Sequence, residues 1–312
     1  MQKLSKVSVL VPCYNEVENV KPLAYAIIQE LKKLENYDYE LVFIDNHSTD
    51  RTQKLIEELC TENNKIKAIF NNKNFGQFNS PYYGLQQTTG DCTILICADF
   101  QDPIDMISQF VKEWENGYKI VIGIKNKSQE NKLMYFLRSC YYKLIKKMSS
   151  TEQIEHFTGF GLYDKEFIKE LRKLDDPMPF LRGIVAELGY KRKEIPYEQQ
   201  KRKAGKTKNN FYTLYDAAMI GFTSYTKAGL RIATLIGVIT AIISFTIGIV
   251  YLVLKLIYWD RFVAGTSPIL IGMFFLGAIQ LLFIGILGEY ILSMNVRLMK
   301  RPLVIEEKRI NF

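Results

Sequence analysis

The 312-residue sequence is poor in the residues that build zinc clusters and disulfide frameworks. It contains five cysteines and two histidines. The cysteines form no Cys-x-x-Cys pair and no even-numbered framework, so we predict reduced cytosolic thiols and neither a zinc site nor a disulfide. The sequence also lacks internal repeats and low-complexity tracts. We expect no secretory signal, because residues 1–6 lead directly into a predicted strand.

Positive charge is in excess, with a formal net charge of +8 at pH 7. A nucleic-acid-binding protein could have this balance. The basic residues, however, gather beside apolar helices, which indicates contact with an anionic membrane surface and not with nucleic acid. The length leaves room for one large domain and an appendage.

Short apolar strands alternate with helices in the first 130 residues. Strands are predicted at residues 7–12, 40–44, 66–70, 93–98 and 119–124, and helices at 19–34, 52–62, 79–87 and 104–115. This alternation predicts an α/β fold with a mostly parallel sheet covered on both faces.

The composition changes from residue 230 onward. Residues 230–259 and 267–293 are apolar, and each segment exceeds the roughly 20 residues that cross a bilayer. We therefore predict two transmembrane helices. Segments at about 131–148 and at 209–229 are amphipathic and are predicted to lie in the membrane interface. Ordinary packing of these two helices on the α/β domain is the alternative.

The predicted organisation has six parts. They are an α/β domain at 1–208 that contains the amphipathic helix at about 131–148, a juxtamembrane amphipathic helix at 209–229, a transmembrane helix at 230–259, an extracytoplasmic loop at 260–266, a transmembrane helix at 267–293 and a cytosolic basic tail at 294–312. Basic residues are abundant before the first span and after the second but not in the loop. The positive-inside rule therefore places both termini in the cytosol.

The segment CADFQDP at residues 97–103 ends a buried apolar run with acidic groups. A carboxylate such as Asp99 at the C-terminal end of a strand lies at the edge where α/β folds bind ligands. Hard oxygen ligands there suit Mg²⁺ or Mn²⁺, which in turn neutralise a diphosphate. An acidic turn without a function is the alternative for this motif alone.

Two more polar motifs follow predicted strands. VPCYNE occupies residues 11–16 and DNHSTD occupies residues 45–50. Both would face the same crevice as Asp99. An aromatic ring and carboxylates in that crevice suit a nucleotide base and a ribose.

Together these motifs resemble those of family 2 glycosyltransferases with the GT-A fold. The resemblance rests on VPCYNE, DNHSTDRT, the Asn74-Phe75-Gly76 turn, ADFQDP and the basic segment RKAGKTK at residues 202–208. It covers nearly the whole chain. The two predicted spans make the chain similar to the polyprenyl-phosphate glycosyltransferases, which include dolichol-phosphate mannose synthases and bacterial undecaprenyl-phosphate glucosyltransferases. The resemblance implies a GT-A nucleotide-sugar-binding domain followed by interfacial and transmembrane helices.

The resemblance also implies roles for individual residues. Its catalytic set is Asp99, Gln101, Arg202 and Lys208, of which Asp99 and Gln101 would serve the metal and the diphosphate, and Arg202 and Lys208 would bind phosphates. Its donor-binding set is Pro12, Tyr14, Glu16, Asp45, Asn74 and Gly76. A purely topological role as a positive-inside stretch is the alternative for residues 202–208, and we expect both roles.

The chain departs from the family pattern at two places. Cys97 stands where the family usually has an aspartate, and Gly159 and Gly161 lie in a region where relatives often carry an aspartate and an arginine. A thiol is a poor ligand for Mg²⁺, so we expect the metal to rest on Asp99 and the phosphates of the donor.

His47 and His156 are the only histidines. We interpret His47 as a polar loop residue. A catalytic role for His156, near the expected acceptor side, is left open. An acceptor phosphate is already an anion and needs no strong general base.

The resemblance implies an inverting, metal-dependent transferase. It would move a hexose from a nucleotide diphosphate, UDP, to undecaprenyl phosphate at the cytosolic face of a bacterial membrane, supplying lipid-linked sugar for cell-envelope glycans. We expect a homo-oligomer. A polysaccharide-extending synthase is one alternative, although two spans offer little protein for a channel. A catalytically inactive membrane scaffold is another, suggested by Cys97.

Overall fold

The structure, a computed structural model, describes residues 5–127, 154–174, 176–200, 219–220, 222–223, 228–258, 266–299 and 301–312. The predicted amphipathic helix at about 131–148 lies outside these residues. So do the basic segment at 202–208, with Arg202 and Lys208, and most of the predicted juxtamembrane helix.

One eight-stranded sheet forms the centre of the α/β domain. Its strands are β1 (Ser5–Cys13), β2 (Tyr37–Asp45), β3 (Ile66–Asn71), β4 (Cys92–Leu95), β5 (Ile120–Lys127), β6 (Phe157–Asp164), β7 (Arg192–Glu198) and β8 (Glu306–Ile310). Their order across the sheet is β7-β5-β6-β4-β1-β2-β3-β8. Parallel pairs join β1 to β2 and β4, β2 to β3, and β5 to β7, whereas β6 and β8 pair antiparallel with their neighbours. The prediction of a mostly parallel α/β sheet is confirmed.

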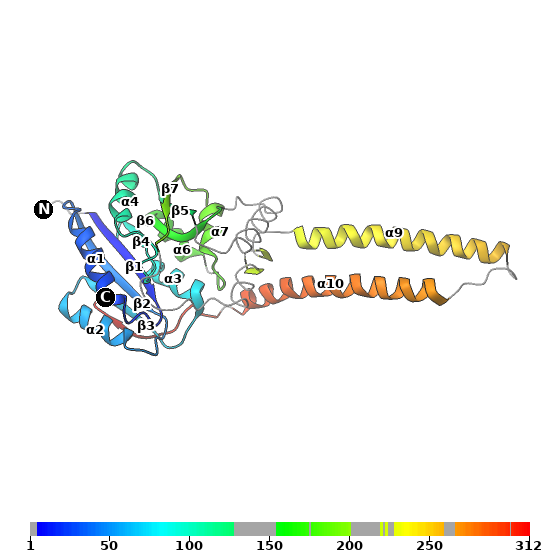
Figure 1. The fold of residues 1–312 in the computed structure, drawn as a ribbon, viewed down its shortest axis with the longest axis horizontal. Coiled ribbons are helices and arrows are strands. Elements are labelled where there is room, and N and C mark those ends of the chain that lie inside the picture. Colours follow the sequence, from blue (N-terminus) through cyan, green and yellow to red (C-terminus); the bar gives the residue numbers. More distant parts are fainter. Residues whose placement is uncertain are drawn as a thin grey trace.

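Helices cover both faces of this sheet (Figure 1). They are α1 (Val20–Lys32), α2 (Thr52–Glu62), α3 (Gly76–Gln87), α4 (Met106–Glu115), α6 (Lys165–Lys173) and α7 (Leu181–Glu187). The buried side chains of α1, α2 and α4 belong to one hydrophobic cluster, and those of α3, α6 and α7 belong to a second. The two clusters lie on opposite faces of the sheet because side chains alternate along each strand.

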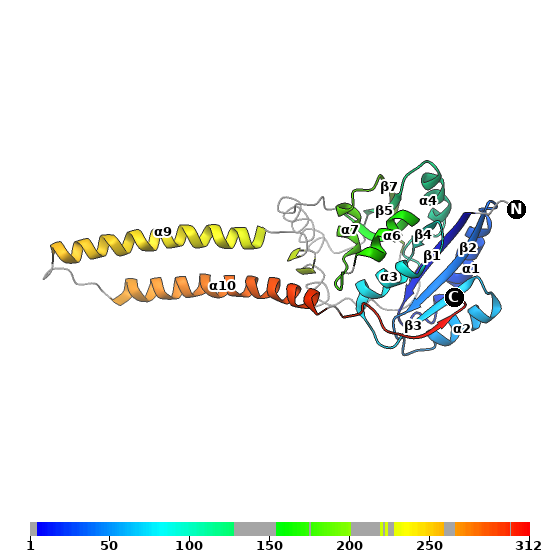
Figure 2. The ribbon, with the colours of Figure 1, turned by 180° about the vertical axis from the view of Figure 1, so that it is seen from behind.

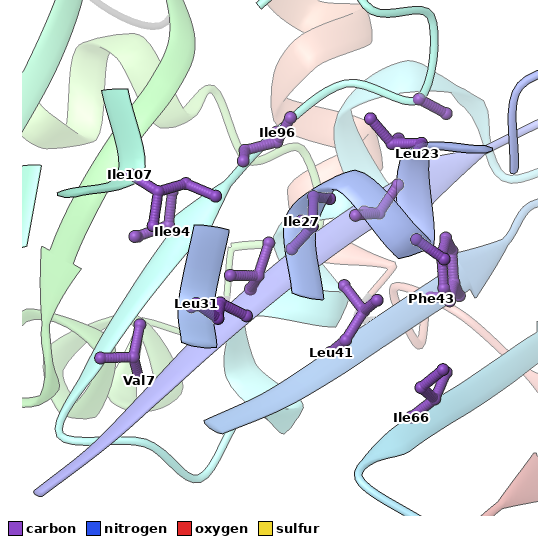
Figure 3. Packing of buried hydrophobic residues seen from close by; sticks show 14 of the residues in the cluster. Val7, Leu23, Ile27, Leu31, Leu41, Phe43, Ile66, Ile94, Ile96 and Ile107 are labelled. Atoms are coloured by element: carbon purple, nitrogen blue, oxygen red, sulfur yellow. The ribbon is translucent and has the colours of Figure 1, made fainter. Parts of the chain in front are cut away.

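The first cluster shows how sequence periodicity becomes packing (Figure 3). Leu23, Ile27 and Leu31 recur every four residues on α1, so they share one face of the helix. That face lies on Leu41 and Phe43 of β2, and all five side chains are at most 2% exposed. Burying each such side chain stabilises the fold by about 1.5–3 kcal/mol.

A buried ionic cluster lies near the N-terminal end of β2. The carboxylate of Glu40 is 1% exposed and accepts hydrogen bonds from the ammonium of Lys6 at 2.7 Å and the hydroxyl of Ser8 at 2.6 Å. The ammonium of Lys67 lies 2.8 Å from it. Burial alone would raise the pKa of Glu40, but these partners outweigh it and lower the pKa from 4.5 to about 2. Glu40 therefore stays ionised inside the protein.

Two long apolar helices, α9 (Ala228–Ile257) and α10 (Thr266–Leu298), run side by side away from the sheet (Figures 1 and 2). Along α10, Phe275–Leu298 is long and apolar enough to cross a membrane, with a mean hydropathy of 1.9. Within the described part of α9, the apolar stretch Ile232–Ile247 is shorter. One helix of the described chain thus meets the criteria for a span, and the second span stays a prediction.

The C-terminal residues differ from the expectation of a basic tail at 294–312. Helix α10 continues to Leu298, and Glu306–Ile310 form β8, which pairs antiparallel with β3. The ammonium of Lys308 lies 3.0 Å from a carboxylate oxygen of Glu57 on α2. The predicted bounds of the α/β domain, 1–208, therefore omit one strand of its sheet. The prediction missed this strand because the charged sequence EEKRI has no apolar alternation that would indicate one.

Candidate active site

The C-terminal ends of β1, β2 and β4 lie together at one edge of the sheet. In the parallel register Cys13 is opposite Asp45, and Leu10 is opposite Leu95. The amide of Ile96 also donates to the carbonyl of Leu10 at 3.0 Å. The structure therefore brings the three predicted strand-end motifs, VPCYNE, DNHSTD and ADFQDP, to the same edge.

Hydrogen bonds hold the loops after β1 and β2 against each other. The backbone amide of Asn15 donates to the hydroxyl of Ser48 at 2.8 Å, and the side-chain oxygen of Asn15 accepts from the amide of Thr49 at 2.7 Å. The amide of Glu16 donates to the hydroxyl of Thr52 at 2.9 Å. Asn15 reaches this position with a φ of 55°, a region that asparagine adopts more readily than most residues. The two motifs thus form one fixed unit.

Asp45 lies at the centre of this unit and is fully buried. Its carboxylate accepts hydrogen bonds from the amide of Ser48 at 2.9 Å and from the side-chain amide of Gln53 at 2.7 Å. Burial, followed by the charge of Asp45, raises the pKa of the Cys13 thiol well above its ordinary value, so this thiol stays neutral. In the structure Asp45 organises the loop. Its predicted contact with a nucleotide stays a prediction.

The other predicted donor-binding residues, Pro12 in β1 and Tyr14 and Glu16 after it, adjoin or belong to this unit. Pro12 and Tyr14 are half-buried, whereas Glu16 is 8% exposed. The carboxylate of Glu16 accepts from the side-chain amide of Asn19 at 2.7 Å. Tyr14 is therefore partly accessible at this edge, and Glu16 is fixed next to it.

Asn46 connects the loop after β2 to the turn after β3. Its side-chain amide donates to the side-chain oxygen of Asn74 at 2.9 Å and to the carbonyl of Gly76 at 3.1 Å. Its side-chain oxygen accepts from the side-chain amide of Asn71 at 3.1 Å and the backbone amide of Phe75 at 2.9 Å. Gly76 has a φ of 88°, which suits glycine. Asn46 therefore positions the predicted donor-binding pair, Asn74 and Gly76.

The two carboxylates of ADFQDP have different environments. Asp99 is half-buried and accepts from the backbone amide of Gln101 at 3.2 Å. Asp102 is 3% exposed and accepts from the backbone amide of Cys97 and from the hydroxyl of Tyr197, each at 3.1 Å. Asp102 therefore holds the motif together, and Asp99 is the carboxylate that reaches the surface.

Lys125 adds a positive charge to this edge. It lies in β5 opposite Tyr197 of β7, and its amide donates to the carbonyl of His156 at 3.3 Å. Burial and the charge of Asp99 raise the pKa of Asp102, and the charge of Lys125 opposes this rise. The sequence analysis missed Lys125 and Tyr197. The rule that singled out Asp99, a polar residue directly after a predicted strand, would have found Lys125.

The chain returns to the acidic motif after β7. The amide of Gln200 donates to the carbonyl of Gln101 at 3.1 Å. Arg202 follows two residues later in the sequence. The described chain therefore contacts ADFQDP at Gln200, and the basic segment at 202–208, with Arg202 and Lys208, lies outside the described residues.

The residues at this edge suit a hard divalent cation that also binds the substrate. Asp99 offers a carboxylate and Gln101 an amide oxygen, whereas Cys97 is exposed and offers only a thiol. Among the residues that the structure describes, no three histidine, cysteine, aspartate or glutamate side chains cluster as a metal site would require. Mg²⁺ is often held by one or two carboxylates together with substrate phosphates and water. The oxygen atoms of Asp99 and Gln101 fit this mode of metal binding.

Gly159 and Gly161 are the two glycines at which the chain departs from the family pattern. The strand pairing explains the glycine at position 161. A Cβ atom there would lie 2.5 Å from the carbonyl oxygen of Val121 on the adjacent strand. Any side chain at position 161 would push β5 and β6 apart. The carbonyl of Gly159 accepts a hydrogen bond of 2.7 Å from the hydroxyl of Tyr163. An aspartate or arginine at position 161 is therefore incompatible with this strand pairing.

The two histidines lie at different places on the molecule. His47 is exposed with a φ of 65° in the loop after β2, as expected of a polar loop residue. His156 is half-buried with a φ of 59° and directly precedes β6. Its carbonyl accepts from Lys125, as described above, and a catalytic role for its ring stays open.

Comparison with known proteins agrees with this geometry. Residues 8–172 match Glycosyl transferase family 2. The chain is 32% identical over 298 residues to a prophage bactoprenol glucosyl transferase homolog of Escherichia coli K12, covering 95% of this chain and 97% of that protein. It is 32% identical to the bactoprenol glucosyl transferase of Shigella phage SfX, covering 97% and 99%, and 31% identical to that of Shigella phage SfV, covering 95% and 96%.

Proposed function

The chain belongs to glycosyl transferase family 2 and is therefore a transferase, and we propose that it moves a hexose from a UDP-hexose donor to undecaprenyl phosphate. The observation that carries the proposal is the half-buried carboxylate of Asp99 after β4, in the motif whose Gln101 carbonyl accepts from the amide of Gln200. Relatives that are named bactoprenol glucosyl transferases and align over nearly their full length support the lipid acceptor.

The proposed donor site uses the edge formed by β1, β2 and β4. Tyr14 offers a partly accessible ring for the base, and Pro12 lies beside it. Asn74 and Gly76 are exposed in the turn that Asn46 holds, so they can contact the nucleoside. Asp45 and Glu16 keep these loops in place.

The diphosphate would lie next to Asp99. Asp99 and Gln101 would hold Mg²⁺ or Mn²⁺, which stabilises the charge that develops on the leaving diphosphate. Arg202 and Lys208 would bind phosphate oxygens through charge-assisted hydrogen bonds. The rate would come mainly from fixing the two phosphates relative to each other.

The acceptor reaction we propose is a single displacement with inversion. An oxygen of the polyprenyl phosphate attacks the anomeric carbon, and the bond from that carbon to the diphosphate breaks. The acceptor oxygen is already anionic, so no strong base is required. Lys125 supplies a positive charge near Asp102.

The position of β8 supports two membrane spans. The α/β domain precedes α9, and β8, which follows α10, belongs to the sheet of the same domain. The chain must therefore cross a membrane an even number of times between them. Since α10 contains one apolar stretch of sufficient length, we assign the second span to α9. With nucleotide sugars in the cytosol, the domain and both termini lie there. A homo-oligomer stays a prediction.

The test is transfer by the purified full-length protein in detergent. The protein would be incubated with a panel of labelled UDP and GDP sugars, undecaprenyl phosphate and Mg²⁺, and the product extracted into organic solvent and identified by mass spectrometry. We expect a monoglycosylated undecaprenyl phosphate. An aqueous polymer would favour the polysaccharide synthase. If no donor is hydrolysed or used for transfer, the result would favour the inactive scaffold.

A further inference from the structure

The last residues of the chain close the edge of the sheet next to the candidate donor site. In β8, Lys308 pairs with Phe70 of β3 and Glu306 pairs with Asn71. Just before β8, the carbonyl of Ile305 accepts from the amide of Asn72 at 3.0 Å. The C-terminal strand therefore holds the end of β3, where the chain turns toward Asn74 and Gly76.

Side chains hold β8 at both of its ends. At the start, the hydroxyl of Tyr83 on α3 donates to the carboxylate of Glu306 at 2.9 Å. At the end, the side-chain amide of Asn311 donates to the carbonyls of Cys60 and Ile66, each at 2.8 Å. Because these groups come from α3, α2 and β3, the strand is fixed to three elements of the domain.

A chain of amides leads from this strand to the candidate donor site. Asn71 is fully buried, and its side-chain amide donates to Asn46 at 3.1 Å and to the hydroxyl of Ser80 at 3.0 Å. Asn46 in turn holds Asn74 and Gly76. Each residue in this series is placed by the one before it, beginning with the pairing of β8.

From these contacts we propose that β8 is a positioning element of the donor site, so that nucleotide affinity depends on the C-terminal residues 306–312. The inference rests on the proposed use of a nucleotide-sugar donor. Without β8, the end of β3 would become a free edge that frays, as chain ends and strands with few contacts do. Binding would then have to order the turn at 74–76, and that cost lowers affinity.

The experiment uses the full-length protein in detergent, with UDP and Mn²⁺ as the probe. Two variants remove or weaken the attachment of β8. One deletes residues 306–312, and the other combines Tyr83→Phe with Asn311→Ala, which removes the side-chain bonds made by these two residues. The control is Lys308→Met on the same strand, whose ion pair with Glu57 on α2 is exposed. Titration calorimetry gives the Kd for UDP, and steady-state kinetics give the KM values for donor and acceptor.

We expect the deletion to weaken UDP binding and raise the donor KM by about tenfold or more. The Tyr83/Asn311 double variant should weaken UDP binding severalfold, and Lys308→Met should leave it unchanged. The acceptor KM and the kcat at saturating donor should change less than twofold in each case. A purely structural role would instead lower the active fraction and kcat without a selective effect on the donor.

Coupling to Asn46 gives a second readout. Combining Asn46→Ala with the deletion should weaken UDP binding hardly more than Asn46→Ala alone, because both changes release the same turn. Unchanged donor affinity in a folded deletion variant would overturn the inference. If the deletion variant does not fold, unchanged affinity in the Tyr83/Asn311 variant would overturn it. Failure of the wild-type protein to bind any nucleotide would contradict the proposed function itself.

Discussion

The hydroxyl of Tyr197 donates a hydrogen bond of 3.1 Å to the buried carboxylate of Asp102, 95 residues away in the sequence. This bond ties the end of β7 to the acidic motif that carries Asp99. The ring of Tyr197 also packs edge-on against Phe160, with centroids 5.3 Å apart. The position of Asp99 thus depends on a residue that no sequence motif indicates.

Tyr197→Phe should destabilise the protein, although it leaves the packing of the ring nearly unchanged. The change removes the donor to Asp102, and a buried carboxylate that loses a hydrogen bond costs about 1–3 kcal/mol. The pKa of Asp102 should rise further, since the donor stabilises the ionised form. The midpoint of thermal unfolding in detergent measures the effect. Tyr25→Phe, which removes an exposed hydroxyl–carboxylate bond to Glu62, is the control, and equal midpoints for the two variants would contradict the assigned role.

Asp99→Asn should preserve the fold and abolish most turnover. An amide is a weaker ligand than a carboxylate for a hard cation, so transition-state stabilisation should fall by several kcal/mol, a loss of roughly 100-fold or more. Sugar transfer at saturating donor measures this, with Asp105→Asn on the exposed start of α4 as the control. Full activity of Asp99→Asn in the presence of EDTA would refute the metal role. Cys97→Asp should change activity only modestly.

Arg202→Ala and Lys208→Ala should each weaken use of the donor or of the lipid phosphate. A lost charge-assisted contact corresponds to about 1.5–3 kcal/mol. The ratio kcat/KM for each substrate measures the effect, and Lys203→Ala in the same segment is the control. If both single variants keep wild-type kinetics, the segment only orients the chain in the membrane.

The sequence predicted the parts of the fold that depend on local pattern. Apolar runs located the first five strands, and the rule that ligands lie at the C-terminal ends of parallel strands brought Asp45 and Asp99 to one edge. Long-range contacts could not be predicted in this way. Tyr197 reaches Asp102 from a half-exposed strand. Four of the five residues of β8 are charged, and the strand is stabilised by pairing with β3 and by side-chain contacts.

Acidification should weaken the protein through Glu40. Its folded-state pKa is about 2, below the ordinary value of 4.5, so the ionised form stabilises the fold above about pH 4.5. That contribution, about 3 kcal/mol from the shift in pKa, is lost as the pH falls from 4.5 toward 2. Glu40→Gln should therefore lower the unfolding midpoint at pH 7 and flatten its dependence on pH in this range. Glu35→Gln, which is exposed, is the control.

Cysteine labelling tests the predicted topology. In a chain whose native cysteines are replaced, an impermeant maleimide added to intact cells should modify Ala264→Cys in the loop between the helices. It should not modify Glu307→Cys in β8 until the cells are lysed. The opposite pattern would invert the hairpin and separate the catalytic domain from cytosolic nucleotide sugars.

The pairing of β8 with β3 also sets an order of events during biosynthesis. Tyr83 and its partner Glu306 are 223 residues apart, and the two apolar helices are made between them. The ribosome therefore releases the residues that finish the sheet only after both helices have been synthesised. Until then β3 presents an open edge, which is a template for aggregation. A nascent chain that stops before β8 keeps that edge exposed, so the sheet is completed only when translation has passed residue 310.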